Sequence, residues 1–167
     1  MNKKHTAISI ATLSLFALLF LTFSCNNNGT ECTIPCYYGA CVNNVCNCNY
    51  GFEGDSCTIR TVDRFIGNWD AFDSCQTNNY GYTATISASS SVINEILITN
   101  FGQFGTSFVA TGTVTGISIT IPVQNVQGIV LSGAGTIDTA ADEISITFSV
   151  KDELMIEDAC NGIWKKK

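Results

Sequence analysis

The sequence is poor in histidine, in basic residues and in helical patterning, and each absence narrows what the protein can do. The only histidine, His5, lies within the first 24 residues, so the rest of the chain lacks the commonest general base of enzymes. Serine and threonine are plentiful, but no G-x-S-x-G elbow, glycine-rich phosphate loop or H-E-x-x-H motif occurs. We therefore expect a protein that is not an enzyme and that uses no metal or organic cofactor.

The shortage of basic residues limits the choice of partners. Two of the eight Lys and Arg residues, Lys3 and Lys4, lie near the start, so from Cys25 onward fourteen acidic residues face six basic ones. A net charge near −8 disfavours nucleic acid and anionic membrane surfaces as partners. Three acidic pairs, at 142–143, 152–153 and 157–158, lie at turns or strand ends with no cleft in view. We interpret them as solvating groups rather than as the carboxylates of a glycosidase.

Residues 1–24 are typical of an export signal. Lys3 and Lys4 form its basic start, and residues 7–23 are apolar and uncharged, at the short limit for a bilayer span. Ser24 and Cys25 follow directly, which resembles the lipobox of bacterial lipoproteins, although Phe23 departs from the small residues preferred there. The resemblance implies cleavage before Cys25 and its acylation, for example with palmitate. The alternatives are an uncleaved anchor or ordinary signal cleavage, and both leave Cys25 free.

The number of cysteines supports acylation. Nine cysteines would strand one thiol in an oxidising compartment, whereas eight can all pair once Cys25 carries lipid. Residues 25–31 are then a lipidated cysteine and a flexible polar tether. The tether lacks the acidic run that accompanies surface display in Bacteroidetes-type lipoproteins. We expect a membrane-attached lipoprotein of the cell envelope, at the outer membrane, with the periplasmic and the surface-facing side both open.

Residues 32–57 contain six cysteines in the pattern C-x3-C-x4-C-x4-C-x-C-x8-C. So short a segment cannot bury a core that offsets its chain entropy, so crosslinks must stabilise it. Six cysteines allow fifteen pairings, and the spacing alone does not choose among them. A zinc site built on the C-x-C is the alternative, which the lack of histidine and the export signal upstream disfavour.

The second half of this segment, residues 46–57, resembles the end of an epidermal-growth-factor-like (EGF-like) module. The C-x-C, the pair Gly51-Phe52, and Gly54 before the last cysteine are all present. The resemblance implies three disulfides, namely Cys32–Cys41, Cys36–Cys46 and Cys48–Cys57. Some EGF-like modules bind calcium through side chains just before the first cysteine. Asn28 and Glu31 fit that pattern and Thr30 does not, so we expect no metal.

Residues 61–167 have the composition and the period-two alternation of an antiparallel β domain. Strands are predicted at 80–86, 93–100, 107–114, 117–123, 128–131, 135–139, 143–150 and 154–157, after a short helical turn near residue 64. No helical stretch intervenes, so parallel crossovers are excluded and consecutive strands pair as a meander. Such strands close into a barrel or stack as a sandwich, and the short turns and the removal of sheet edges favour the barrel. We predict an all-β protein: an EGF-like module followed by an up-and-down, lipocalin-like barrel of about eight strands.

Two observations refine the barrel. Cys75 and Cys160 lie near its first and last strands, and a disulfide between them would join the ends of the meander. Gly67 and Trp69 resemble the G-x-W that opens lipocalin-type barrels, where the tryptophan crosses the closed end. The late arginine that packs on this tryptophan in lipocalins is missing, because Arg60 and Arg64 both precede it.

These features predict a lipid-anchored envelope protein with a non-catalytic binding, adhesion or structural role and a protein or glycan partner. The candidate contact residues are Tyr37, Tyr38, Tyr80 and Tyr82, for which packing inside the barrel or the hairpins is the alternative. The alternative function is a carrier of a small apolar ligand inside a lipocalin-like barrel. Inward-facing Ile, Val and Phe dominate the predicted strands, which favours a packed core instead.

Overall fold

The computed structural model describes residues 32–138, 140–154 and 156–167. The predicted export signal, the lipidated Cys25 and the tether lie outside the described residues. Within the described part of the chain, strands dominate and the helical segments are single 3-10 turns. None of the helices in that part is long and apolar enough to cross a membrane.

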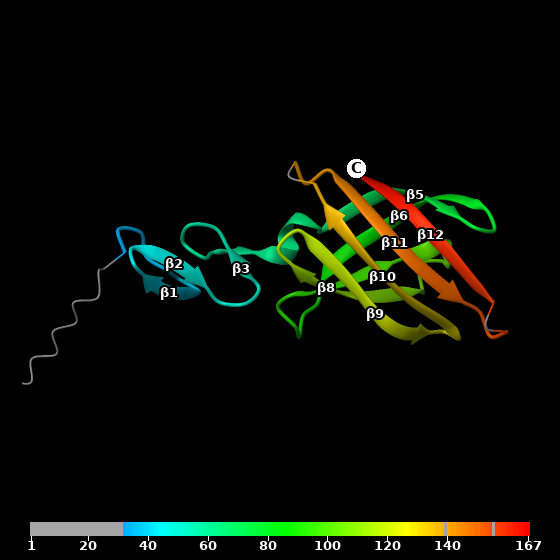
Figure 1. Ribbon diagram of the computed structural model, residues 1–167, viewed down its shortest axis with the longest axis horizontal. Helices are drawn as coiled ribbons and strands as arrows, with labels where there is room; N and C mark the ends of the chain where they lie inside the picture. The colour runs from blue at the N-terminus through cyan, green and yellow to red at the C-terminus, as the bar shows by residue number, and fades with distance from the viewer. Residues whose placement is uncertain (1–31, 139, 155) are drawn as a thin grey trace, which may run out of the picture. The chain divides into compact units, whose positions relative to one another are not determined.

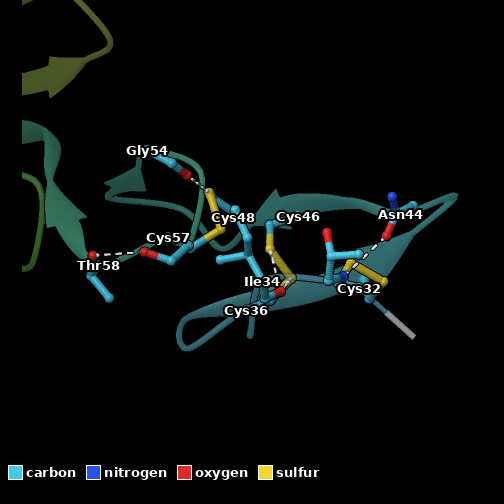
Figure 2. The surroundings of a disulfide bond; sticks show 12 residues. Cys32, Ile34, Cys36, Asn44, Cys46, Cys48, Gly54, Cys57 and Thr58 are labelled. Carbon is cyan, nitrogen blue, oxygen red and sulfur yellow. Dashed lines mark hydrogen bonds between the residues drawn. A yellow bond between two sulfur atoms is a disulfide. The ribbon is translucent and has the colours of Figure 1, made fainter. Parts of the chain in front are cut away.

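The cysteine-rich segment, residues 32–57, is built on one hairpin (Figure 1). Strands β1 (Gly39–Val42) and β2 (Val45–Cys48) pair antiparallel, and β3 (Phe52–Glu53) pairs with β4 (Ile59–Arg60). Asn43 and Asn44 both have positive φ, as a two-residue hairpin turn requires. Figure 2 shows disulfides of this module, and the three pairs are those that the EGF-like resemblance implies: Cys32–Cys41, Cys36–Cys46 and Cys48–Cys57.

The rest of the chain forms a closed antiparallel barrel of eight strands (Figure 1). The strands are β5 (Gly67–Cys75), β6 (Asn79–Ala88), β7 (Glu95–Thr99), β8 (Val109–Thr115), β9 (Ser118–Val126), β10 (Ile129–Ile137), β11 (Glu143–Lys151) and β12 (Glu157–Lys166). Each pairs with its neighbour in sequence, and β12 returns to pair with β5. The predicted all-β fold with an up-and-down barrel is confirmed. The division into domains at residues 32–57 and 61–167 stays a prediction, because both fall within one unit.

The disulfide Cys75–Cys160 joins the first and last strands. The two cysteines are direct partners in the register of β5 and β12, and 85 residues separate them in the sequence. The same closure leaves no sheet edge in the barrel.

One end of the barrel is closed around Trp69. A 3-10 turn, η2 (Thr61–Arg64), precedes β5, and the indole Nε1–H of the fully buried Trp69 donates to the carbonyl of Phe65 at 2.8 Å. Lys166, on β12, places its Nζ 5.4 Å from the centre of the Trp69 ring. The cation over this tryptophan is therefore a lysine of the last strand and not the late arginine of lipocalins.

The prediction of two strands at 128–131 and 135–139 is wrong, because β10 is one continuous strand. Ser132 and Gly133, which separate the two predicted strands, lie within it, and the pairing of β10 with β9 shifts register between Leu131 and Gly133. This irregularity also explains why Val123 is 78% exposed, although it lies two residues after Ile121 and four after Ile119, both of which are buried. A bulge adds a residue to one strand and so reverses the alternation beyond it.

The prediction of a last strand at 154–157 is also wrong. The carboxylate of Asp152 accepts the backbone N–H groups of Leu154 and Ile156 at 2.9 and 3.0 Å, so this segment is a turn. The true last strand, β12, begins at Glu157. Its inward positions include Cys160 and Gly162, so it lacks the continuous apolar face that marks the other strands.

Candidate functional site

A cavity of about 190 Å³ lies at the end of the barrel that carries the Cys75–Cys160 disulfide. Its walls come from strands β5, β6, β11 and β12 and from the loop around the 3-10 turn η3 (Phe101–Gln103). The lining residues are Asp73, Cys75, Tyr80, Gly102, Gln103, Phe104, Phe148, Val150, Asp158 and Cys160. The cavity is smaller than the roughly 300–1,000 Å³ of ordinary ligand sites, so it suits only a small molecule.

A buried carboxylate lies at the floor of this cavity. Asp73 is fully buried, and each of its oxygens accepts one hydrogen bond. The Tyr82 hydroxyl donates to Oδ2 at 2.6 Å, and the indole Nε1–H of Trp164 donates to Oδ1 at 2.9 Å. The backbone N–H of Gly102 in turn donates to the Tyr82 hydroxyl at 3.0 Å. The network therefore joins three strands of the barrel to the loop that borders the cavity.

Burial controls the ionisation of this network. Loss of hydration raises the pKa of Asp73 above its ordinary value of 3.8, and the hydrogen bonds from Tyr82 and Trp164 oppose part of that rise. Burial also raises the pKa of Tyr82 far above its usual range, and the neighbouring Asp73 charge adds to the effect. Tyr82 thus stays protonated and acts as a hydrogen-bond donor to Asp73.

The rim of the cavity is held by side-chain contacts between the β5–β6 turn and β12. Asp158 accepts the backbone N–H of Thr77 at 3.2 Å and also bonds its hydroxyl, and that hydroxyl lies 3.3 Å from the Tyr80 hydroxyl. The sulfurs of Cys75 and Cys160 lie near the Asp158 carboxylate, but both are bonded in the disulfide. They offer no thiolate for a metal, so we interpret the rim contacts as stabilising the β5–β6 turn against β12.

The four candidate tyrosines occupy two different kinds of environment. Tyr37 and Tyr38 are 67% and 52% exposed on the cysteine-rich segment, and Tyr38 stacks on Phe52 with ring centres 4.2 Å apart. Tyr80 lines the cavity, and Tyr82 turns inward to Asp73. The structure therefore removes Tyr82 from the predicted exposed contact surface and assigns it to the interior of the barrel.

Asp73 was missed in the sequence, although the alternation of β5 carries a signal for it. Trp69, Ala71 and Asp73 are all buried, so the aspartate is in phase with the inward residues of its strand. Its two partners could not be found in the same way. Tyr82 and Trp164 lie 9 and 91 residues away, and only the closure of the barrel brings them together.

Replacing Gly162 by alanine is expected to lower the free energy of unfolding by roughly 1–3 kcal/mol, because the interior is already filled. A Cβ at Gly162 would collide with the Asp73 carboxylate and lie 2.9 Å from Ile146 Cγ2, so the hydrogen bond from Trp164 to Asp73 must shift. Gly81→Ala is the matched control, since a Cβ there has no neighbour within 4 Å. Urea denaturation followed by tryptophan fluorescence measures both variants. Equal stability of the two would contradict the proposed close approach.

Comparison with models of known protein families finds no match, and comparison with curated proteins finds no significant match. The structure by itself therefore defines the class, which is an eight-stranded up-and-down β-barrel preceded by a disulfide-bonded module.

Proposed function

We propose that this chain is a lipid-anchored, non-catalytic protein of the cell envelope, with a binding or structural role that its outer surface performs. The packed barrel interior is the observation that carries the proposal. Trp69, Phe101 and Trp164 fill it and are fully buried, and the cavity described at one end is small. Such a barrel is a rigid scaffold rather than a container.

The disulfides support an envelope location. All eight cysteines of the described residues are bonded in four pairs. Disulfides of this density persist in oxidising compartments outside the cytoplasm. Their pairing leaves Cys25 as the ninth cysteine, which acylation would consume.

Cys25→Ser is expected to abolish lipid attachment. The wild-type chain, expressed in a bacterium with lipoprotein-processing enzymes, should incorporate radiolabelled palmitate and remain with the membranes, because two or more acyl chains anchor stably. The Cys25→Ser variant should carry no label. Ser24→Ala is the control, since it keeps a small residue before the cysteine and should be labelled normally. A wild-type chain without label would overturn the lipid anchor.

The second candidate is a carrier of a small ligand, and the cavity at the end of the barrel favours it. Phe104, Phe148 and Val150 give that cavity an apolar wall, and the buried Asp73 lies at its floor. Native mass spectrometry of the protein purified in its oxidised form separates the two candidates. A mass equal to the polypeptide and its modifications supports the scaffold. A reproducible added mass, lost on denaturation, would establish the carrier instead.

A further inference from the structure

We propose that one end of the EGF-like module rests on the surface of the lipid bilayer. The contact is made by the side chains of Ile34, Val42 and Val45, which we call the apolar tip. The inference depends on the proposed lipidation of Cys25, because that anchor holds the module near the membrane. It goes further in assigning a second, non-covalent membrane contact to side chains of the folded module.

The apolar tip is exposed and held rigidly. Ile34, Val42 and Val45 are 47%, 50% and 67% exposed, in a module too small to cover them. Val42 and Val45 are direct partners at the end of the β1–β2 hairpin, and the disulfides of Cys41 and Cys46 fix their neighbours in sequence. Because the side chains are already ordered, a surface that buries them gains apolar contact with little loss of conformational entropy.

The three side chains belong to the same end of the module as the point where the chain enters it. The backbone N–H of Thr33 donates to the side-chain oxygen of Asn44 at 3.1 Å, so the hairpin turn lies beside Cys32. Figure 2 shows Asn44 next to Cys32 at this end. Ile34 and Val45 border one surface hollow of about 260 Å³ together with Cys32 and Asn44. The apolar residues are thus grouped around the entry of the chain.

The short tether between Cys25 and Cys32 favours the lipid bilayer as the partner of the apolar tip. Cys32 follows Cys25 by seven residues, which span at most about 25 Å when fully extended. With Cys25 held in the membrane by its acyl chains, the apolar tip is confined to a thin layer above the bilayer. This confinement keeps the apolar tip at a high effective concentration next to the lipid surface, so the tip would contact the lipid even if its affinity were weak. Another protein would have to enter that layer to compete.

The chemistry of the module suits a lipid surface without requiring charge. Ile34, Val42 and Val45 lie within residues 32–52, which contain no Asp, Glu, Lys or Arg, and the one charged residue that borders the hollow beside them is Asp55. Because the module offers no basic side chain, the contact should be insensitive to salt and to anionic lipids, unlike electrostatic membrane binding.

Depth-dependent quenching tests the contact in the full-length lipidated protein. A tryptophan is placed in the apolar tip by Val45→Trp, and the protein is reconstituted into phosphatidylcholine vesicles with or without bromine on the acyl chains. The native tryptophans, Trp69 and Trp164, are fully buried in the barrel and give a constant background. Val123→Trp is the matched control, because Val123 is an exposed valine on the outside of the barrel.

We expect Val45→Trp to emit at a shorter wavelength in vesicles and to lose roughly half of its added fluorescence to brominated lipid, because interfacial side chains lie within reach of the acyl chains. The control should show neither change. The quenching of Val45→Trp should be the same in about 0.1 M and about 1 M salt, because the contact involves no charge. Equal quenching of the two variants, or none, would overturn the proposal.

Flotation of the same samples on a density gradient distinguishes loss of the lipid anchor from loss of the apolar-tip contact. Protein that floats with the vesicles while Val45→Trp remains unquenched retains its lipid anchor and refutes the contact of the apolar tip. Wild-type protein that neither floats nor carries palmitate refutes the anchor itself. Quenching that disappears at high salt would assign the contact to charged groups elsewhere and would also refute the apolar tip.

Discussion

Replacing Cys75 and Cys160 together by alanine is expected to lower the free energy of unfolding of the barrel by about 4 kcal/mol, the entropic effect of closing a long loop. The disulfide links residues 85 apart, so its removal frees almost the whole barrel sequence in the unfolded state. It also joins β5 to β12, the one pairing in the barrel that consecutive strands do not supply. The measurement is urea denaturation of the oxidised proteins, followed by tryptophan fluorescence.

The disulfide Cys36–Cys46 provides a matched control. Its cysteines are 10 residues apart in the N-terminal disulfide-bonded module, and both tryptophans of the chain lie in the barrel. Replacing this pair by alanine should therefore leave the fluorescence transition close to that of the wild type. Two double variants with the same shift in midpoint would contradict the assignment of the barrel's stability to Cys75–Cys160.

Replacing Asp73 by alanine is expected to lower the free energy of unfolding by roughly 2–4 kcal/mol, because two buried donors lose their acceptor. The indole N–H of Trp164, which is fully buried, and the hydroxyl of Tyr82 would both be left without a partner in the described network. Asp73→Asn should cost less, since the amide oxygen can still accept from Trp164. An alanine variant as stable as the asparagine variant would contradict this account.

The pH dependence of the Asp73 contribution follows from its raised pKa. Between 3.8, the value in the unfolded chain, and the higher pKa of the folded protein, the folded state holds a proton that the unfolded state has released. Folding takes up a proton in this window, so the contribution of Asp73 to stability is present at low pH and decreases as pH rises. The free energy of unfolding of the wild type, relative to that of Asp73→Asn, should therefore decrease as the pH is raised from about 4 toward neutrality. Urea denaturation of both proteins across this pH range measures the difference.

Strands with one continuous apolar face could be predicted from the sequence. In β11, Ile144, Ile146 and Phe148 alternate with polar residues, and the structure buries all three. The pairing of the first strand with the last could also be predicted from the sequence, because short turns make neighbouring strands pair and a cysteine lies near each end of the barrel sequence. These features depend on local alternation and on chain order, which a sequence displays directly.

Strands β10 and β12 could not be predicted correctly because their apolar pattern is interrupted. Gly133 and Gly135 occupy positions in β10 where a Cβ would meet the backbone of β11, so they imitate a turn in the sequence while serving close packing. Gly162 in β12 is similar, since it leaves room for Asp73. The site was hidden for the same reason: the partners of Asp73 are set by the registers of β5 with β6 and with β12, and these are long-range properties.

Pairing of the first and last barrel strands makes the barrel depend on contacts that are distant in the sequence. Cys75 bonds a partner 85 residues away, and β5 has only one of its two neighbours until β12 has docked. The cysteines of the N-terminal disulfide-bonded module, in contrast, bond partners 9 or 10 residues away. We therefore expect the module to close its short loops quickly, whereas the barrel folds slowly, as an open sheet, until β12 pairs with β5.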